Sequence, residues 1–369
     1  MFDPYYAKLA ELAVNYSLKV KKGDRIVILG PALAKDLFLA VHNEVLKAGG
    51  HPLLIPQLEG EEELFFKYAS DEQLGYFDEI YLYMAREFDG LIQIFGDYNT
   101  KKLTFVDPKK MGKLRGAAKR FEMRKILFQR EAKGEADFVV IPYPCQSFAQ
   151  EANMDLYSYS NFVEKALFLD KEDPIKEWEQ IQKKQETIVK YLNKVKDIQV
   201  LGEDTDLTLS VEGRIWDNCS GQKNLPDGEV YTGPVENSVN GHIRFTYPGI
   251  YQGKEIENIF LEFKDGKVIR GTAGKGQGLL QEILKIRNAN KLGEFAIGTN
   301  YGIQQFTKNM LFDEKMGGTM HCALGTGLPN TGSKNISAIH WDILKDMKLP
   351  GSKIIADEIV IYEEGNWKI

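Results

Sequence analysis

Cysteine is scarce in this sequence of 369 residues. Only Cys145, Cys219 and Cys322 occur, they are widely spaced, and none belongs to a Cys-x-x-Cys pair. Disulfide-rich secreted chains carry an even number of cysteines at regular spacing, so this pattern argues against that class. It favours a protein of a reducing compartment.

Long apolar runs and an excess of basic residues are absent as well. No apolar run approaches the roughly 18 residues of a membrane span. The first residues, Met1-Phe-Asp-Pro-Tyr-Tyr, lack the basic patch and apolar block of a signal peptide. Lys and Arg number 47 against 53 Asp and Glu, a net charge of −6, whereas phosphate backbones are bound by concentrated basic surfaces. We therefore expect a cytoplasmic protein that binds neither membranes nor nucleic acid.

What is present is a globular composition, with 43% hydrophobic and 27% charged residues, at a length that suits two domains. Up to about residue 170, apolar runs that favour buried strands alternate with helical patterns, which is typical of an open, mainly parallel α/β sheet. The pattern predicts strands at 25–30, 51–56, 77–83, 91–96 and 137–142. It predicts helices at 33–48 and 108–132.

The texture changes near residue 198, after a long amphipathic helix that begins at Pro174. Short alternating runs then follow one another, separated by turns such as Lys264-Asp-Gly, which is the pattern of antiparallel strands. We predict an α/β plus α+β architecture. Residues 1–196 form an N-terminal α/β scaffold domain that ends in a long bridging helix, and residues 197–369 form a mixed, largely antiparallel C-terminal domain.

Histidine is also scarce, and two of the five copies lie close together in the C-terminal half. The run Ile336-Ser-Ala-Ile-His340-Trp-Asp342 predicts a strand in which His340 and Asp342 share one face. His321 lies on a second run, bounded by Gly318 and Gly325. Imidazole and carboxylate groups that project together are divalent-metal ligands, so two adjacent segments supply most of a metal site.

Two glutamates have similar surroundings. Glu229 follows a turn signal and opens an apolar run, and Glu294 follows a glycine and opens a short apolar run. Each glutamate or histidine alone would be interpreted as a structural or solvated residue. Together, Glu229, Glu294, His321, His340 and Asp342 suit two metals that share carboxylates, an arrangement with the ions about 3.5–4 Å apart that hydrolyses amides.

The segments that carry these residues resemble the metal-binding segments of the M29 family of metallo-aminopeptidases, the aminopeptidase T and aminopeptidase S type. They are Leu225-Pro-Asp-Gly-Glu229, Leu292-Gly-Glu294, Phe312-Asp-Glu-Lys-Met-Gly-Gly-Thr-Met-His321 and Ser337-Ala-Ile-His340-Trp-Asp342. The resemblance is densest over residues 200–345. It implies that these five side chains bind two divalent ions per chain, with zinc, cobalt and manganese all compatible with the mixed ligands.

The resemblance further implies an exopeptidase that removes N-terminal residues from short peptides with a water activated by paired metals, and a homodimer. The residue that shuttles the proton stays open. One position departs from the family: Gly325-Thr-Gly-Leu328-Pro has leucine where the family carries a tyrosine implicated in catalysis. The alternative hypothesis is therefore a catalytically weak or inactive relative that binds metal or peptides.

Other chemistries fit less well. The glycines at Gly30 and in the run 271–278 lack the spacing of dinucleotide and P-loop motifs, so a nucleotide-dependent enzyme rests on fold-level analogy alone. The sequence has no Gly-x-Ser-x-Gly elbow. Cys322 follows His321 directly, and neighbouring residues of a strand face opposite sides, so the two are poorly placed for a dyad.

Overall fold

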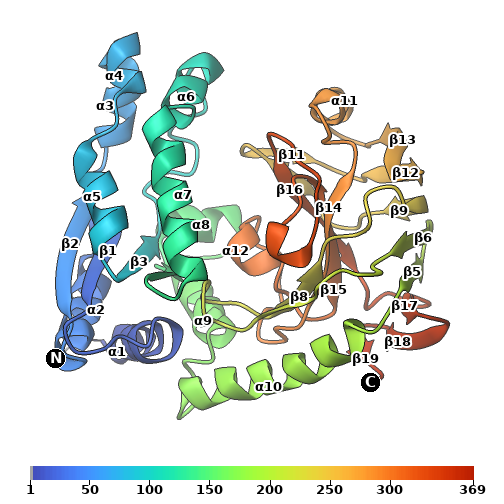
Figure 1. Cartoon of the computed structure of the whole chain (residues 1–369), viewed down its shortest axis with the longest axis horizontal. Helices are drawn as coiled ribbons and strands as arrows, with labels where there is room; N and C mark the ends of the chain where they lie inside the picture. Colours follow the sequence, from blue (N-terminus) through green and yellow to red (C-terminus); the bar gives the residue numbers. More distant parts are fainter. Residues whose placement is uncertain (1–2) are drawn as a thin grey trace. The chain divides into compact units, whose positions relative to one another are not determined.

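The computed structural model describes residues 3–369, which divide into two compact units (Figure 1). The first unit comprises residues 3–175 together with Gly221–Leu225, and the second comprises Lys176–Ser220 and Pro226–Ile369. None of the helices in the described chain combines the length and apolar character that a bilayer crossing requires.

The first unit is built on a four-stranded sheet of order β2-β1-β3-β4 in which every neighbouring pair is parallel. The strands are β1 (Arg25–Pro31), β2 (His51–Gln57), β3 (Gly90–Phe95) and β4 (Asp137–Pro142). Helix α2 (Lys35–Lys47) connects β1 to β2 and packs on both, as a parallel crossover requires. The predicted open parallel α/β sheet is confirmed.

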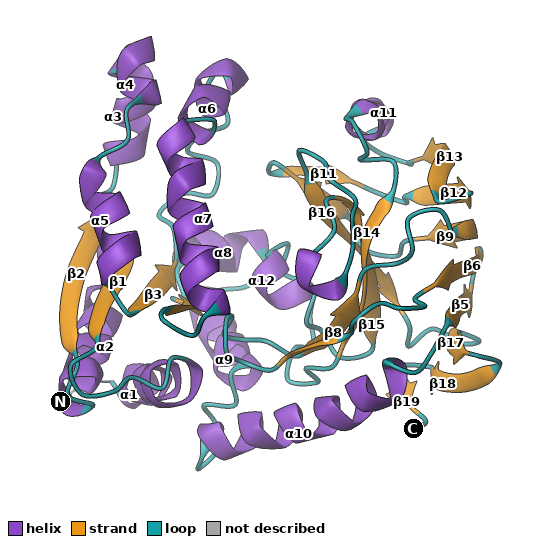
Figure 2. Cartoon of the chain, viewed as in Figure 1, coloured by secondary structure: helices purple, strands orange, loops and turns teal. Residues whose placement is uncertain are grey.

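Helices make up most of the rest of this unit, as the purple ribbons of Figure 2 show. They are α1 (Pro4–Glu11), α3 (Glu61–Tyr68), α4 (Asp71–Gly75), α5 (Glu79–Glu87), α6 (Pro108–Arg115), α7 (Ala118–Ala132), α8 (Gln146–Glu151) and α9 (Leu156–Ala166). The helix predicted at 108–132 is two helices, because Gly116 ends α6 and Ala117 adopts an extended ψ of 124° before α7 begins.

The strand predicted at 77–83 is wrong, because this segment enters helix α5. Asp78 caps the helix by accepting a hydrogen bond from the backbone N–H of Ile80 at 3.0 Å. Leu82 and Ala85, three residues apart, are the buried positions. Residues 80–85 are an unbroken run of apolar and aromatic side chains, and the period of such a short run does not separate a helix from a strand.

The second unit contains two main sheets, shown as orange arrows in Figure 2. An eight-stranded sheet has the order β13-β12-β9-β6-β5-β17-β18-β19. Its strands are β5 (Asp197–Gly202), β6 (Thr205–Ser210), β9 (Asn240–Arg244), β12 (Phe260–Lys264), β13 (Lys267–Thr272), β17 (Lys353–Ala356), β18 (Ile359–Glu363) and β19 (Asn366–Trp367). All its neighbouring pairs are antiparallel, which confirms the largely antiparallel C-terminal region.

The five-stranded sheet has the order β16-β15-β14-β8-β7 and is also antiparallel. Its strands are β7 (Asp217–Cys219), β8 (Glu229–Thr232), β14 (Leu292–Gly298), β15 (Thr319–Gly325) and β16 (His340–Asp346). Val230, Phe295, Cys322 and Ile343 join the hydrophobic core that both sheets share, so one face of this sheet is apolar. The second unit also contains a hairpin of β10 (Gly249–Tyr251) and β11 (Lys254–Ile256), and helix α11 (Gln277–Lys285).

Helix α10 (Pro174–Leu192) groups almost entirely with the second unit. Gln185 of this helix is 1% exposed, and its side-chain amide donates hydrogen bonds to Asn218 Oδ1, Cys219 O and Glu229 O at 2.8–2.9 Å. The helix is thereby bonded to β7 and β8. The contacts group this helix with the second unit, so the division between the units falls before it. The sequence predicts a domain boundary after the helix, near residue 196, and that boundary stays a prediction.

Two expectations near the metal-ligand candidates also differ from the structure. The strand that carries His340 begins at this residue and not at Ile336. The sequence also predicts a helix from Tyr301 to Phe312, but within this segment the structure has only the start of the short helix α12 (Met310–Asp313). Asp313 explains this difference, since its carboxylate accepts hydrogen bonds from the N–H and hydroxyl of Thr307 and so closes a turn in place of a helix.

Candidate metal centre

The structure brings all five side chains predicted from the sequence together on the five-stranded sheet. Nε2 of His321 lies 3.4 Å from both Glu229 Oε2 and Glu294 Oε1. Nε2 of His340 lies 3.1 Å from Glu294 Oε2 and 3.3 Å from Asp342 Oδ1. Residues from four strands and separated by up to 113 positions therefore meet in one cluster, and Glu294 stands at its centre with one oxygen directed to each histidine.

The alternation of the strands explains why these residues meet. In the antiparallel register, Ala296 pairs with both Tyr231 and His321, and Ala323 pairs with Asp342. Paired residues project from the same face, so Glu229, two residues from Tyr231, shares that face with His321 and Asp342. The intervening Ala296 and Ala323 are small and leave space above the sheet. We call this surface the ligand face, and the opposite surface the core face.

Glu294 reaches the ligand face because of a β-bulge. The register shifts between Leu292 and Glu294, so these residues point to opposite faces although they are two positions apart. Leu292 lies in the core and Glu294 in the cluster. Gly293, at the bulge, is required by its surroundings: a Cβ there would lie 2.4 Å from the carbonyl oxygen of Thr326.

The same carbonyl fixes the orientation of His340. Nδ1 of His340 lies 2.7 Å from Thr326 O, and a carbonyl only accepts, so Nδ1 carries the proton in this contact. Nε2 is then directed toward Glu294 and Asp342. A backbone acceptor on the outer nitrogen of an imidazole is the usual way in which proteins orient a metal-binding histidine.

The carboxylates make the cluster strongly attractive to positive charge. Burial lowers the pKa of His321, but Glu294 and Glu229 outweigh it and raise the pKa to about 9. For His340 the charge of Asp342 likewise overcomes burial and raises the pKa to about 12. Burial also opposes the ionisation of Glu294, yet the two histidines hold its pKa well below the usual range. A cation that binds the imidazole nitrogens displaces these protons.

The donor atoms fit divalent ions in number, type and spacing. One atom each from Glu229, Glu294 and His321 lies within 4.8 Å of the others, and the same holds for Glu294, His340 and Asp342. In the described part of the chain, Glu229 Oε2 and Asp342 Oδ1 are buried atoms without a hydrogen bond, although each lies 3.3–3.4 Å from an imidazole nitrogen of the cluster. Buried carboxylate oxygens normally have a partner, so these atoms suit a cation. Two overlapping groups that share Glu294 form the candidate metal centre.

Sequence reasoning missed two charged residues at this centre, Glu314 and Lys315. A carboxylate oxygen of Glu314 lies within 4.8 Å of donor atoms of His321 and Asp342, and its side chain is 20% exposed. Lys315 is buried, forms a close ion pair with Glu229, and lies 2.8 Å from Glu314 Oε1. The available signal was an adjacent acid and base, separated from Gly317-Gly318 by Met316 alone, in a segment that is otherwise mostly apolar or glycine.

The loop after β15 contains the leucine that departs from the family pattern. Leu328 precedes a short 3₁₀ turn, Pro329–Thr331. Asn330 in this turn donates hydrogen bonds to the hydroxyl of Tyr231, at 2.7 Å, and to Asp217 Oδ2, at 2.6 Å. The Tyr231 hydroxyl in turn donates to Asp217 Oδ2 at 2.9 Å. A phenol on the ligand face is thus bonded to the same loop in which the expected phenol is missing.

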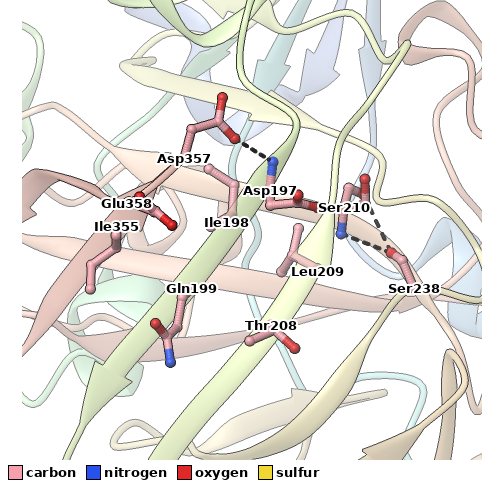
Figure 3. Close-up of a pocket in the computed structure, with 10 residues that line it drawn as sticks. All are labelled: Asp197, Ile198, Gln199, Thr208, Leu209, Ser210, Ser238, Ile355, Asp357 and Glu358. Carbon is pink, nitrogen blue, oxygen red and sulfur yellow. Dashed lines mark hydrogen bonds between the residues drawn. The ribbon is translucent and has the colours of Figure 1, made fainter.

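Two other features of this unit lie apart from the centre. Cys322 is fully buried in the core, on the face opposite His321, as the alternation predicts. A hollow of about 610 Å³ lies over β5, β6 and β17, and none of the five candidates lines it. Figure 3 shows the residues that line this hollow. Asp357 in this hollow accepts hydrogen bonds from the backbone N–H groups of Lys196 and Asp197, so its carboxylate is used within the fold.

The fold and this donor cluster identify a class of protein, the metalloproteases. The chain belongs to the M29 family, described as thermophilic metalloproteases, which matches residues 2–367. The resemblance seen in the sequence is thereby confirmed.

Curated relatives and a solved structure agree with this assignment. Aminopeptidase 2 of Geobacillus stearothermophilus is 27% identical and covers 98% of this chain and 97% of its own length. Aminopeptidase T of Thermus thermophilus is also 27% identical, over 79% of this chain and 76% of its own. The structure of wild-type AmpT from Thermus thermophilus superposes with a TM-score of 0.86 over 99% of both chains, and at 23% identity this likeness establishes the fold.

Proposed function

We propose that this chain is an aminopeptidase that removes N-terminal residues from short peptides and binds two divalent ions, zinc, cobalt or manganese. The observation that supports this most directly is the pair of overlapping donor groups that share Glu294. The names of the relatives, all aminopeptidases, support the exopeptidase specificity.

Each donor has a defined role in this proposal. Glu229, Glu294 and His321 would hold one ion, and Glu294, His340 and Asp342 would hold the other. When bound, paired divalent ions supply Lewis acidity that polarises an amide carbonyl and makes a water acidic enough to attack at neutral pH. Thr326 keeps His340 in the tautomer whose Nε2 is free to bind.

Glu314 is the residue that we assign to proton transfer. Its Oε1 is engaged by Lys315 at 2.8 Å, which leaves Oε2 to accept a proton from the attacking water and to deliver it to the leaving amine. Its side chain is partly exposed, unlike those of Glu229 and Glu294, so substrate has access to it. One of its carboxylate oxygens lies within 4.8 Å of donor atoms of both His321 and Asp342, so Glu314 borders the candidate metal centre.

Hydrolysis of aminoacyl-nitroanilides and dipeptides tests the function directly. We expect activity that is lost on chelation and restored by one or more of zinc, cobalt and manganese. Glu294→Gln should abolish both metal binding and turnover. Glu282→Gln, on the exposed surface of α11, is the matched control and should behave as the wild type.

Glu314→Gln separates proton transfer from metal binding. We expect it to keep two ions and to lower kcat by about 10²–10⁴, the usual contribution of a general acid–base group. Unchanged kcat in this variant would remove Glu314 from the mechanism while the metal assignment stands.

The second candidate function is a catalytically weak or inactive relative that binds metal or peptides. Leu328 is the observation that favours it, because a hydroxyl expected near the reacting group is missing. Metal binding with normal affinity, without turnover over a broad panel of dipeptides and tripeptides, would establish this alternative and contradict the first.

The proposal also includes a homodimer and a cytoplasmic location. The dimer follows from resemblance to the family and is tested by the mass of the purified chain in solution. The location is supported by the free state of all three cysteines, which is usual in reducing compartments.

A further inference from the structure

A third group of donor atoms lies beside the two that form the candidate metal centre. Atoms of Cys219, Asp227 and Glu229 lie within 4.8 Å of one another. Glu229 belongs both to this group and to the group of Glu294 and His321, so the three groups form a continuous row across the sheet. A thiol and two carboxylates at such spacing are ligands that zinc or cobalt accepts.

The third group contains a lysine ammonium in place of an imidazole. The ammonium of Lys315 forms a close ion pair with Glu229 Oε1 and lies 3.8 Å from Asp227 Oδ1. Glu314 Oε1 is a further partner at 2.8 Å. The Lys315 side chain is 3% exposed, so water does not screen these charges.

The surroundings hold this group rigidly. Gln185, buried on α10, donates to the backbone carbonyls of both Cys219 and Glu229 and accepts a hydrogen bond from the hydroxyl of Thr299. Gly228, between Asp227 and Glu229, has φ +117°, and a Cβ there would lie 2.7 Å from Asn300. The backbone therefore holds the Cys219, Asp227 and Glu229 donors in place around the Lys315 ammonium.

We propose that Lys315 is a positioning residue and the permanent counter-ion of the Cys219, Asp227 and Glu229 group. This inference rests on the proposed function. The Lys315 ammonium excludes a metal ion from the Cys219, Asp227 and Glu229 group, and it occupies Oε1 of Glu229, so that only Oε2 is presented to the metal pair. The number of ions per chain is thereby limited to two.

Charge balance supports the assignment. If all were ionised, the carboxylates of Glu229, Glu294, Glu314, Asp227 and Asp342 would carry five negative charges, of which two divalent ions would compensate four. The Lys315 ammonium neutralises this remaining charge, and buried charges require such compensation. Without Lys315, this group lacks its cation, and the carboxylates of Asp227 and Glu229 with the Cys219 sulfur would bind a third ion.

Cobalt titration in the absence of peptide tests the inference. We expect the wild-type protein to bind two Co²⁺ per chain without the intense near-ultraviolet absorption of thiolate–cobalt ligation. Lys315→Met should bind a third ion and gain this absorption, and Cys219→Ser in the Lys315→Met background should lose it again. Lys315→Arg keeps the charge and should keep two ions. With two ions bound, Lys315→Met should lower kcat by about 10- to 100-fold, the usual effect of residues that orient metal ligands.

Several results would overturn the inference. One is a thiolate–cobalt band in the wild-type protein, which needs no variant. Another is a Lys315→Met protein with two ions, no new band and an unchanged kcat. Should Lys315→Met not fold, Asp227→Asn combined with Lys315→Met restores the charge balance, and failure of that double variant to fold with two ions would count against the counter-ion role. If the wild-type protein binds two ions and hydrolyses peptides but the Lys315 variants do not behave as expected, the inference about Lys315 is wrong and the proposed function stands. If the wild-type protein binds no metal, the proposed function itself is contradicted.

Discussion

The two faces of the five-stranded sheet carry opposite kinds of side chain, apolar on one and ionisable on the other. The core face carries Phe295, Cys322 and Ile343, all fully buried among apolar residues. The ligand face carries Glu294, His321 and Asp342, the direct sequence neighbours of those three. Along each strand, one residue thus stabilises the fold and its neighbour belongs to the candidate metal centre. A substitution on the core face should lower stability, and one at the adjacent position on the ligand face should lower activity.

The largest expected difference is between Glu294 and Phe295. Glu294→Gln removes the charge of the shared donor, so peptidase activity should fall by more than the roughly 100-fold that loss of an orienting residue causes. The folded state should remain. Phe295→Ala should instead lower the free energy of unfolding by about 3–5 kcal/mol, as usual for a buried phenylalanine.

Activity, metal content and urea unfolding of both variants test this difference. A Phe295→Ala protein that retains two ions and normal activity whenever it is folded would support it. A Glu294→Gln protein with wild-type activity would contradict the assignment of the two faces.

A smaller effect is expected from Gly293→Ala at the bulge. The new Cβ would press on the carbonyl of Thr326, which orients His340, so metal affinity or activity should fall by about 10- to 100-fold. Gly278→Ala is the matched control, because a Cβ there meets no atom within 4 Å and alanine favours a helix. Equal behaviour of both variants would show that the bulge does not position the site.

Metal removal should reveal the different needs of the two faces in the wild-type protein. The ligand face concentrates carboxylates that repel one another, so bound ions should stabilise the fold by about 2.7 kcal/mol when the free ion is 100 times its dissociation constant. Thermal unfolding with and without a chelator measures this. Glu294→Gln should show little of the shift, and an equally large shift in that variant would place the stabilising ion elsewhere.

The smallest effect concerns the loop above the ligand face. Leu328→Tyr supplies the phenol typical of the family, and we expect kcat to rise by roughly tenfold, or about 1.4 kcal/mol of transition-state stabilisation.

Tyr231→Phe tests whether the phenol already bonded to this loop contributes. If Tyr231→Phe loses kcat without a change in metal content, the Tyr231 hydroxyl contributes to turnover. If neither Tyr231→Phe nor Leu328→Tyr changes kcat, turnover does not depend on a phenol in this loop.

Much of this arrangement could be predicted from the sequence. The parallel sheet followed from clear apolar runs such as that of β1, and the shared face of His340 and Asp342 followed from the period of a strand. Helix α5 could not be predicted, because its unbroken run of apolar and aromatic residues suits a helix or a strand and only the Asp78 cap indicates the helix. The turn at Thr307 depends on the carboxylate of Asp313, six residues further along the chain, which the helical pattern of the segment does not reveal.

The site was predicted in part for the same reasons. Its five donors were evident as residue types in a recognisable order. Glu314 and Lys315 were missed, because an adjacent acid and base usually lie on a solvated surface and only burial reveals otherwise. The bulge at Gly293 was also invisible, although it decides which face Glu294 occupies, since a register shift depends on the partner strand.

The most direct test of the central claim is a crystal structure with cobalt or zinc, with the anomalous signal measured at the metal edge. We predict two peaks per chain on the ligand face, about 3.5–4 Å apart, with one oxygen of Glu294 bound to each ion. The absence of any peak among Glu229, Glu294, His321, His340 and Asp342 in protein that is active and loaded with metal would contradict the account.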